Sequence, residues 1–186
     1  RVALDGDTIF NPNLIDSIDR VSENPKLTYV TGEKFDPSGI KLIVNDTKGN
    51  TKEVTYSEFE SFEITLVGVT DKQVFKVIDN NTTIKVQLKA QDPLELSEKL
   101  KVNKANKVLL QAEYDNKDST HGSYLYFNAS QDKKDNYDDC LNLAKTILLD
   151  DDSTQEQVNL ILDGLKKAYD NLNGSEVDKA PLENKK

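Results

Sequence analysis

The sequence contains no tryptophan, no methionine, one cysteine and one histidine. A single cysteine, Cys140, cannot form a disulfide within the chain, and Cys140 with His121 cannot supply the ligands of a Cys/His metal cluster. No apolar run is long enough to cross a bilayer, so we expect no membrane insertion. The residue types therefore predict neither a metal site nor a cofactor.

Basic charge is also scarce. The 186 residues include 24 Lys and Arg against 33 Asp and Glu, which gives a formal net charge of -9. An acidic surface repels phosphate backbones and anionic lipid, so we expect no nucleic-acid partner. The chain begins "RVALDGDTIF", without methionine or a signal peptide, and we expect it to be a fragment of a longer protein.

The composition changes near Pro93 from Val, Ile, Thr, Phe and Tyr to Leu, Ala, Lys, Asp and Asn, and the apolar period changes from two to about 3.6 residues. This change predicts two domains. We expect an N-terminal linker over residues 1–15, an all-β sandwich over 16–91, an all-α antiparallel three-helix bundle over 92–174 and a C-terminal linker over 175–186.

Short apolar runs separated by turn residues indicate the strands of the first domain. Ile84, Val86 and Leu88 alternate with lysine and glutamine, as expected where one face of a strand is buried. The predicted strands are 40–44, 52–56, 61–67, 72–78 and 82–90.

Three stripes at helical spacing predict the second domain. The first helix is expected over residues 93–113 with Asp92 as its N-cap; its expected buried positions are Leu96, Leu100, Val108, Leu109 and Ala112. A polar loop, "YDNKDSTHG", and a short helical turn, "SYLYFNAS", follow. The second helix is expected to begin near Gln131, and its stripe is Tyr137, Cys140, Leu141, Ala144, Ile147 and Leu148.

The third helix is expected to begin with a capping box in which Ser153 and Glu156 exchange hydrogen bonds. Gly174 is expected to end it in the left-handed conformation. Its predicted stripe is Val158, Ile161, Leu162, Leu165, Ala168, Tyr169 and Leu172.

The segment "LTYVTGEKFDPSGIKLIVNDTKGNTKEVTY" resembles the bacterial Ig-like domain of group 3. The family pattern falls on Tyr29, Gly32, Glu33, Phe35, Asp36, Gly39, Gly49, Val54 and Tyr56. This resemblance covers about residues 16–90 and implies an Ig-like sandwich.

Residues 124–174 are similar to the FIVAR module of Gram-positive wall proteins. The similarity is carried by Asn128-Ala129-Ser130, Tyr137-Asp138, Ala144, Ile147-Leu148, Thr154-Gln155, Val158, Leu165, Ala168 and Leu172-Asn173-Gly174. Cys140 stands where the family usually has alanine, which a buried cysteine can replace.

The two resemblances imply a non-catalytic surface or adhesion fragment of a large secreted or wall-attached Gram-positive protein. The implied partners are neighbouring modules of the same chain and a host-matrix protein or an N-acetylglucosamine-containing glycan. An alternative is the accessory region of a secreted carbohydrate-active enzyme or toxin, and a third interpretation is albumin or immunoglobulin binding by an exposed helix face.

No catalytic set emerges from the residues. His121 is expected to be a solvated loop residue, and Cys140 to belong to the core. Asp150, Asp151 and Asp152 fit helix capping better than calcium binding, and Glu58, Glu60 and Glu63 fit a solvated face better than a glycosidase pair.

Tyrosines supply the candidate ligand-binding residues, because their rings can stack on sugars or anchor a protein partner. The candidates are Tyr114, Tyr124 and Tyr126. An alternative role for Tyr124 and Phe127, three residues apart, is to close the end of the bundle.

Overall fold

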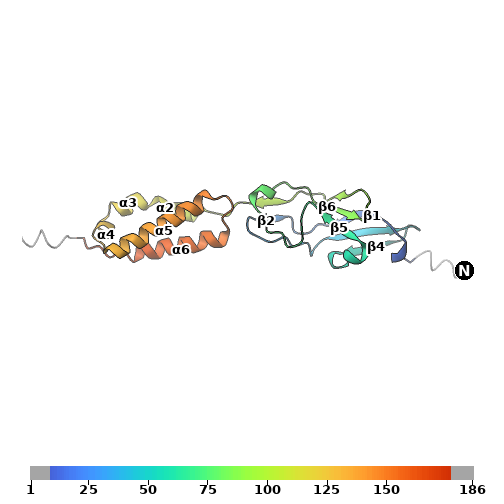
Figure 1. Ribbon diagram of the computed structural model, residues 1–186, viewed down its shortest axis with the longest axis horizontal. Coiled ribbons are helices and arrows are strands. Elements are labelled where there is room, and N and C mark those ends of the chain that lie inside the picture. Colours follow the sequence, from blue (N-terminus) through green and yellow to red (C-terminus); the bar gives the residue numbers. More distant parts are fainter. Residues whose placement is uncertain (1–8, 177–186) are drawn as a thin grey trace, which may run out of the picture. The chain divides into compact units, whose positions relative to one another are not determined.

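The computed structural model describes residues 9–176 (Figure 1). The chain divides into two compact units, Arg1–Asn103, which we call the sheet unit, and Lys104–Lys186, the helical unit. A β-sheet region followed by a helical region is therefore confirmed. The predicted boundary between residues 91 and 92 falls inside the sheet unit.

The sheet unit contains three small sheets. Its strands are β1 (Ile15–Glu23), β2 (Thr28–Val30), β3 (Lys41–Asp46), β4 (Thr51–Thr55), β5 (Ile64–Val67), β6 (Lys85–Leu88), β7 (Leu94–Glu95) and β8 (Lys101–Asn103). Two antiparallel sheets have the orders β1-β3-β4 and β5-β6-β7, while β2 pairs in parallel with β8. The unit also has short 3-10 helices. η1 (Pro12–Leu14) precedes β1, while η2 (Tyr56–Glu58), η3 (Glu60–Phe62) and η4 (Val77–Asp79) lie between strands.

One hydrophobic core is shared by both three-stranded sheets. Leu42 and Val44 of β3 and Val86 of β6 are fully buried in it. Ile84, Val86 and Leu88 are all buried, as their alternation predicts. The placement of this unit in the bacterial Ig-like group remains a prediction.

The residues of the Ig-like pattern organise the turn after β2. Tyr29 is 1% exposed, and its hydroxyl donates to the Lys26 carbonyl (2.9 Å) while accepting from the Asp36 N–H (2.9 Å). Gly32 has a φ of 93°, which favours glycine, and the Glu33 carboxylate accepts from the Val30 N–H (2.6 Å). These side chains therefore have local structural roles.

The segment before β1 differs from the predicted linker. Residues 1–8 lie outside the described part of the chain, but Phe10 packs against the core and the N–H of Asn11 donates to the buried carboxylate of Asp46 (3.0 Å). Burial raises the pKa of Asp46, but the N–H donors of Asn11, Asn50 and Lys48 outweigh it and leave the pKa below its usual value. Residues 9–15 thus belong to the sheet unit.

Of the predicted strands, one is shorter than expected and another segment is not a strand. The strand expected over 61–67 begins only at Ile64, because η3 precedes it and Glu63 adopts a left-handed φ of 58°. The segment 72–78 forms only an isolated bridge between Val74 and Lys34, followed by η4. Apolar spacing in these segments reflects contact with the core without a continuous ladder.

The helix predicted over residues 93–113 is wrong over its first part. Leu96 and Leu100 are buried, as expected, but in the core of the sheet unit. The Leu100 N–H donates to Thr82 (3.0 Å) and the Lys101 N–H donates to Leu27 (2.8 Å). Leucines four residues apart fit a helix, but backbone hydrogen bonds to the segments just before β2 and β6 decide the structure here.

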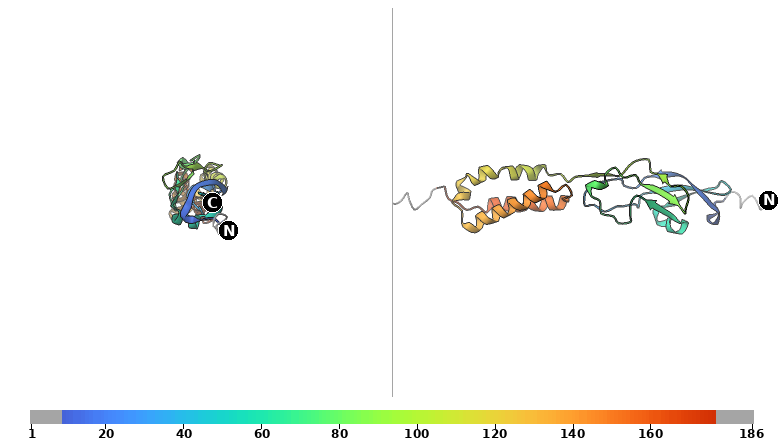
Figure 2. Two further views of the ribbon diagram at one scale, coloured as in Figure 1. Left: turned by 90° about the vertical axis from the view of Figure 1, so that its right-hand side faces the viewer. Right: turned by 45° about the horizontal axis from the view of Figure 1, so that its top comes forward.

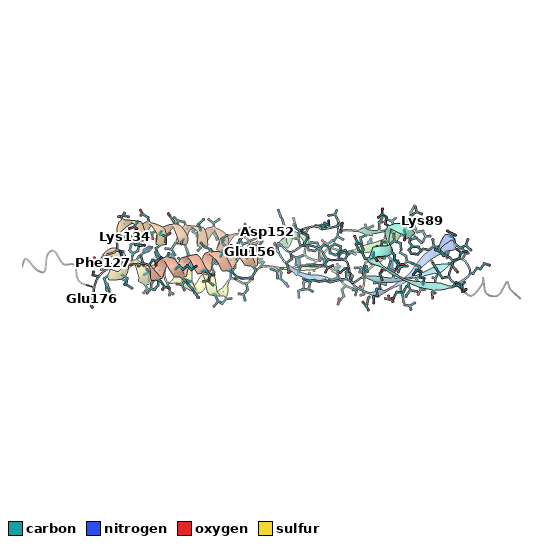
Figure 3. The ribbon with its side chains drawn as sticks, turned by 90° about the horizontal axis from the view of Figure 1, so that it is seen from below. Lys89, Phe127, Lys134, Asp152, Glu156 and Glu176 are labelled. Atoms are coloured by element: carbon teal, nitrogen blue, oxygen red, sulfur yellow. The ribbon has the colours of Figure 1, made fainter. Side chains whose placement is uncertain are left out.

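The helical unit comprises α2 (Val108–Asp115), α3 (Lys117–His121), α4 (Tyr124–Phe127), α5 (Gln131–Leu149) and α6 (Gln155–Asp170). Helices α2, α5 and α6 pack against one another, and Figure 2 shows the α2–α3 segment beside α5 and α6. Phe127 and Glu176 lie at one end of this unit, and Asp152 and Glu156 at the other (Figure 3). The detail of a three-helix bundle is not confirmed, because α3 and α4 are separate short helices.

The stripes of α5 and α6 are largely confirmed, whereas that of α2 is wrong. Buried side chains on α5 and α6 are Tyr137, Leu141, Ala144, Val158, Leu162, Leu165 and Ala168. On α2 the buried residue is Leu110, while Val108 and Leu109 are 72% and 68% exposed. Ala112 and Tyr169 are exposed too. The helix was predicted to begin at residue 93 but begins at Val108, and the face predicted to be buried is therefore wrong.

The cap of α6 lies one residue later than predicted. Thr154 and Gln157 form the capping box. Ser153 is buried instead, and its hydroxyl donates to the Ile147 carbonyl (2.9 Å). That bond ties the last turn of α5 to the start of α6.

Gly174 does not adopt the left-handed conformation predicted for it. Glycine is required here for close packing instead. Its N–H donates to the Leu125 carbonyl (3.0 Å). A Cβ here would lie 2.1 Å from the Tyr124 oxygen and 2.6 Å from the Leu125 oxygen. Of the predicted C-terminal linker, residues 177–186 lie outside the described part of the chain.

Gly174→Ala should therefore destabilise the helical unit by about 1–3 kcal/mol, because the backbone of α4 must move. Gly164→Ala is the matched control: a Cβ at Gly164 meets nothing within 4 Å, and alanine should stabilise α6 by about 0.5–1 kcal/mol. Urea unfolding followed by circular dichroism at 222 nm measures both. Equal effects of the two substitutions would contradict the close approach.

Candidate binding site

A hollow of about 400 Å³ opens on the helical unit and brings aromatic and polar side chains together. It is lined by Tyr114, Lys117, His121, Tyr126, Asp138, Leu141 and Asn142. These come from α2, α3, α4 and α5. We call it the tyrosine hollow.

The carboxylate of Asp138 is the centre of its polar network. Its Oδ2 accepts a hydrogen bond from the Tyr126 hydroxyl (2.5 Å), and its Oδ1 lies 2.7 Å from His121 Nε2. Because an ionised carboxylate can only accept, Nε2 carries the proton and donates it. One side chain of α5 thus holds groups from α3 and α4.

The structure corrects the expectation that His121 is a solvated loop residue. It is the last residue of α3, and its side chain is 38% exposed. Its ring lies edge-on to Tyr126 and Tyr137, at centroid distances of 4.6 and 5.8 Å. The hydrogen bond and both ring contacts fix the imidazole.

Tyr126 stays a hydrogen-bond donor near neutral pH. The hydrogen bond to Asp138, then burial, then the negative charges of Asp138 and Asp135 raise its pKa to about 12. The neutral phenol is a poor nucleophile and a poor base. In the tyrosine hollow, Tyr126 can therefore donate a hydrogen bond and offer its ring for packing.

Two of the three predicted tyrosines meet in the tyrosine hollow. Tyr114 lines it, and the Lys117 ammonium lies 4.3 Å from its ring centroid, within the range of a cation–π contact. Tyr126 lines it as well. Tyr124 is 38% exposed and does not line it; its backbone oxygen instead faces Gly174.

Sequence reasoning missed most of the polar lining. Asp138, Leu141 and Asn142 are spaced three and four residues apart and so share one face of α5, a signal that could have linked them. The pairing of Asp138 with His121 joins residues 17 apart in the chain, and no local pattern indicates it.

A second hollow of about 510 Å³ lies between the α2–α3 segment and α6. Its lining includes one tyrosine, Tyr169, with Glu113, Lys166 and Asp170. We prefer the tyrosine hollow despite its smaller volume, because it combines tyrosine rings with a hydrogen-bonded network of polar groups, as specific ligand sites do.

The other residues considered for chemistry have structural surroundings. Cys140 is half-buried, with its sulfur 3.8 Å from the Gly164 carbonyl; burial, and then the charge of Asp139, raise the pKa of the thiol. Asp151 pairs with Lys104 (3.2 Å). Within residues 9–176, no group of three His, Cys, Asp or Glu side chains converges as metal ligands.

Asp138→Asn should lower the pKa of Tyr126 from about 12 toward the ordinary value of 10.0, because it removes the negative charge and replaces one of the two acceptor oxygens with a donor amide. Ultraviolet titration of the phenolate, with Tyr126→Phe used to assign the signal, measures this change. Asp135→Asn removes only a charge and should lower that pKa less. An unchanged titration in Asp138→Asn would show that the bond is not formed.

Among the described helices, none combines the length and apolar character that a membrane span needs. No curated protein and no solved structure matches the chain. Residues 102–173 match the family model of the FIVAR domain, beginning within β8 and covering the helices α2 to α6. FIVAR domains are accessory modules that occur in extracellular or cell-wall proteins.

Proposed function

We propose that the chain is a non-catalytic part of a large extracellular Gram-positive protein, in which the sheet unit is an Ig-like spacer and the helical unit is the binding module. The observation that carries this proposal is the tyrosine hollow, where Asp138 fixes Tyr126 and His121 beside Tyr114. Whether the parent protein is an adhesin or a secreted enzyme, the module serves to attach it to a surface.

The chemistry of the tyrosine hollow favours a saccharide with N-acetylglucosamine units. The rings of Tyr114 and Tyr126 offer faces for the apolar side of a pyranose ring. A carboxylate has about four acceptor positions, and the two hydrogen bonds to Asp138 leave others for sugar hydroxyls. The Asn142 amide provides both a donor and an acceptor for an acetamido group.

Binding without hydrolysis is the expectation from the same residues. Glycosidases generally place two carboxylates across the scissile bond. Asp138 is the one carboxylate among the residues that line the tyrosine hollow, and the raised pKa of Tyr126 keeps that hydroxyl protonated.

Isothermal titration of the whole chain with chitotetraose tests the proposal. We expect saturable binding that Tyr126→Ala abolishes. Tyr126→Phe, which keeps the ring, should weaken it about two- to ten-fold through the lost hydrogen bond. Tyr124→Ala is the control and should bind like the parent chain.

Circular dichroism establishes that each variant is folded. Absence of chitotetraose binding, or an equal loss in Tyr124→Ala, would contradict the proposal. Fibronectin binding that Tyr126→Ala abolishes, without chitotetraose binding, would instead identify the ligand as a matrix protein.

A further inference from the structure

A second binding surface lies in the sheet unit, along the outer edge of β5. The sheet order β5-β6-β7 leaves β5 paired on one side only. A hollow of about 490 Å³ runs along this edge, and it is lined by Tyr56, Ser57, Phe59, Glu60, Glu63, Ile64, Thr65, Leu66, Val69 and Asp71. We call it the β5 groove.

The strand register shows which backbone groups face the β5 groove. The Lys89 N–H donates to the Glu63 carbonyl (2.9 Å), so residues 63 and 89 form a hydrogen-bonded pair. Such pairs alternate along an antiparallel ladder, and Thr65 opposite Gln87 is the next one. The backbone groups of Ile64 and Leu66 therefore point away from β6.

Three of these outward groups are unpaired, and those of Leu66 are the more accessible, because Ile64 is only 3% exposed. The Ile64 N–H already donates to the Phe59 carbonyl (2.9 Å). In residues 9–176, the Ile64 carbonyl and the N–H and carbonyl of Leu66 have no hydrogen-bond partner. A row of unpaired groups at a sheet edge is a template for strand addition.

The rim of the β5 groove is acidic. Glu60, Glu63 and Asp71 line it together with the ring of Tyr56. Glu63 lies 3.8 Å from the Lys89 ammonium, and Asp71 accepts a long hydrogen bond from the Tyr56 hydroxyl (3.4 Å). Within the described residues Glu60 and Asp71 have no cationic partner, and both are exposed.

We propose that the β5 groove binds an extended, lysine-rich peptide segment of another protein, which adds to the sheet as a strand beside β5. The Ile64 carbonyl and the Leu66 backbone groups supply the main-chain bonds, as in known modes of strand addition. Glu60 and Asp71 face the lysines, and the Tyr56 ring lies where a lysine stem can cross it.

The acidic rim of the β5 groove favours a lysine-rich strand over a second copy of the chain. Two copies joined through their β5 edges would bring Glu60, Glu63 and Asp71 of one copy close to the same carboxylates of the other. Like charges placed opposite one another destabilise a strand pair. A lysine-rich strand has the complementary charge.

Fluorescence anisotropy with a labelled peptide, acetyl-Lys-Val-Lys-Thr-Lys-Val-Lys-amide, and the whole chain tests this proposal. We expect saturable binding that weakens as salt is raised. A peptide with glutamate in place of each lysine should not bind. The basic peptide N-methylated at alternate backbone amides should lose binding, because it cannot donate to the Ile64 and Leu66 carbonyls.

Glu60→Gln and Asp71→Asn should each weaken binding about two- to five-fold. Glu95→Gln on β7, at the opposite edge of the same sheet, is the matched control and should have no effect. Hydrogen exchange of the Leu66 amide should slow when the peptide is bound.

Three results would overturn the proposal. They are no binding of the basic peptide, equal binding of the glutamate peptide, and binding that leaves the Leu66 amide exchanging at its free rate. Concentration-dependent dimerisation that protects the same amide would assign the edge to a second copy instead. Because the tyrosine hollow lies in the other unit, Tyr126→Ala should leave peptide binding intact.

Discussion

The carboxylate of Asp138 is the constraint on which the helical unit's candidate site depends. Helices α3 and α4 are too short to bury a large apolar face. His121 of α3 and Tyr126 of α4 both hydrogen-bond to Asp138, which connects the two short helices to the long helix α5. Because the hydrogen bonds fix both rings, the part of the tyrosine hollow that they line has a defined shape. A preformed site of this kind limits the entropy lost when a ligand binds.

The sheet unit is organised around a different buried group. Tyr29 places its ring against Phe75, at a centroid distance of 4.7 Å, and its hydroxyl between two backbone groups. The polar turn after β2 is thereby anchored to the apolar core. A turn anchored in this way suits the proposed role of this unit as a spacer.

The local sequence pattern was sufficient to predict an element where the period of its apolar residues matches the face that the element buries. The alternation of Ile84, Val86 and Leu88 and the stripes of α5 and α6 follow from the sequence because each element buries one face. The region after Asp92 could not be predicted in this way. Leu96 and Leu100 have helical spacing, but their N–H groups donate to the carbonyls of Ile84 and Thr82, which lie just before β6. The tyrosines were identifiable by residue type, whereas the Asp138–His121 pair depends on how α3 folds back onto α5.

The most direct test of this account uses the single histidine of the chain. A long-range ¹H–¹⁵N spectrum reports the protonation of each nitrogen of one imidazole, without assignment ambiguity. We expect His121 to hold its proton on Nε2, in slow exchange with water, and to lose this protection in Asp138→Asn. An imidazole that exchanges freely between tautomers in the unmodified chain would contradict the shared carboxylate and the preformed hollow that rests on it.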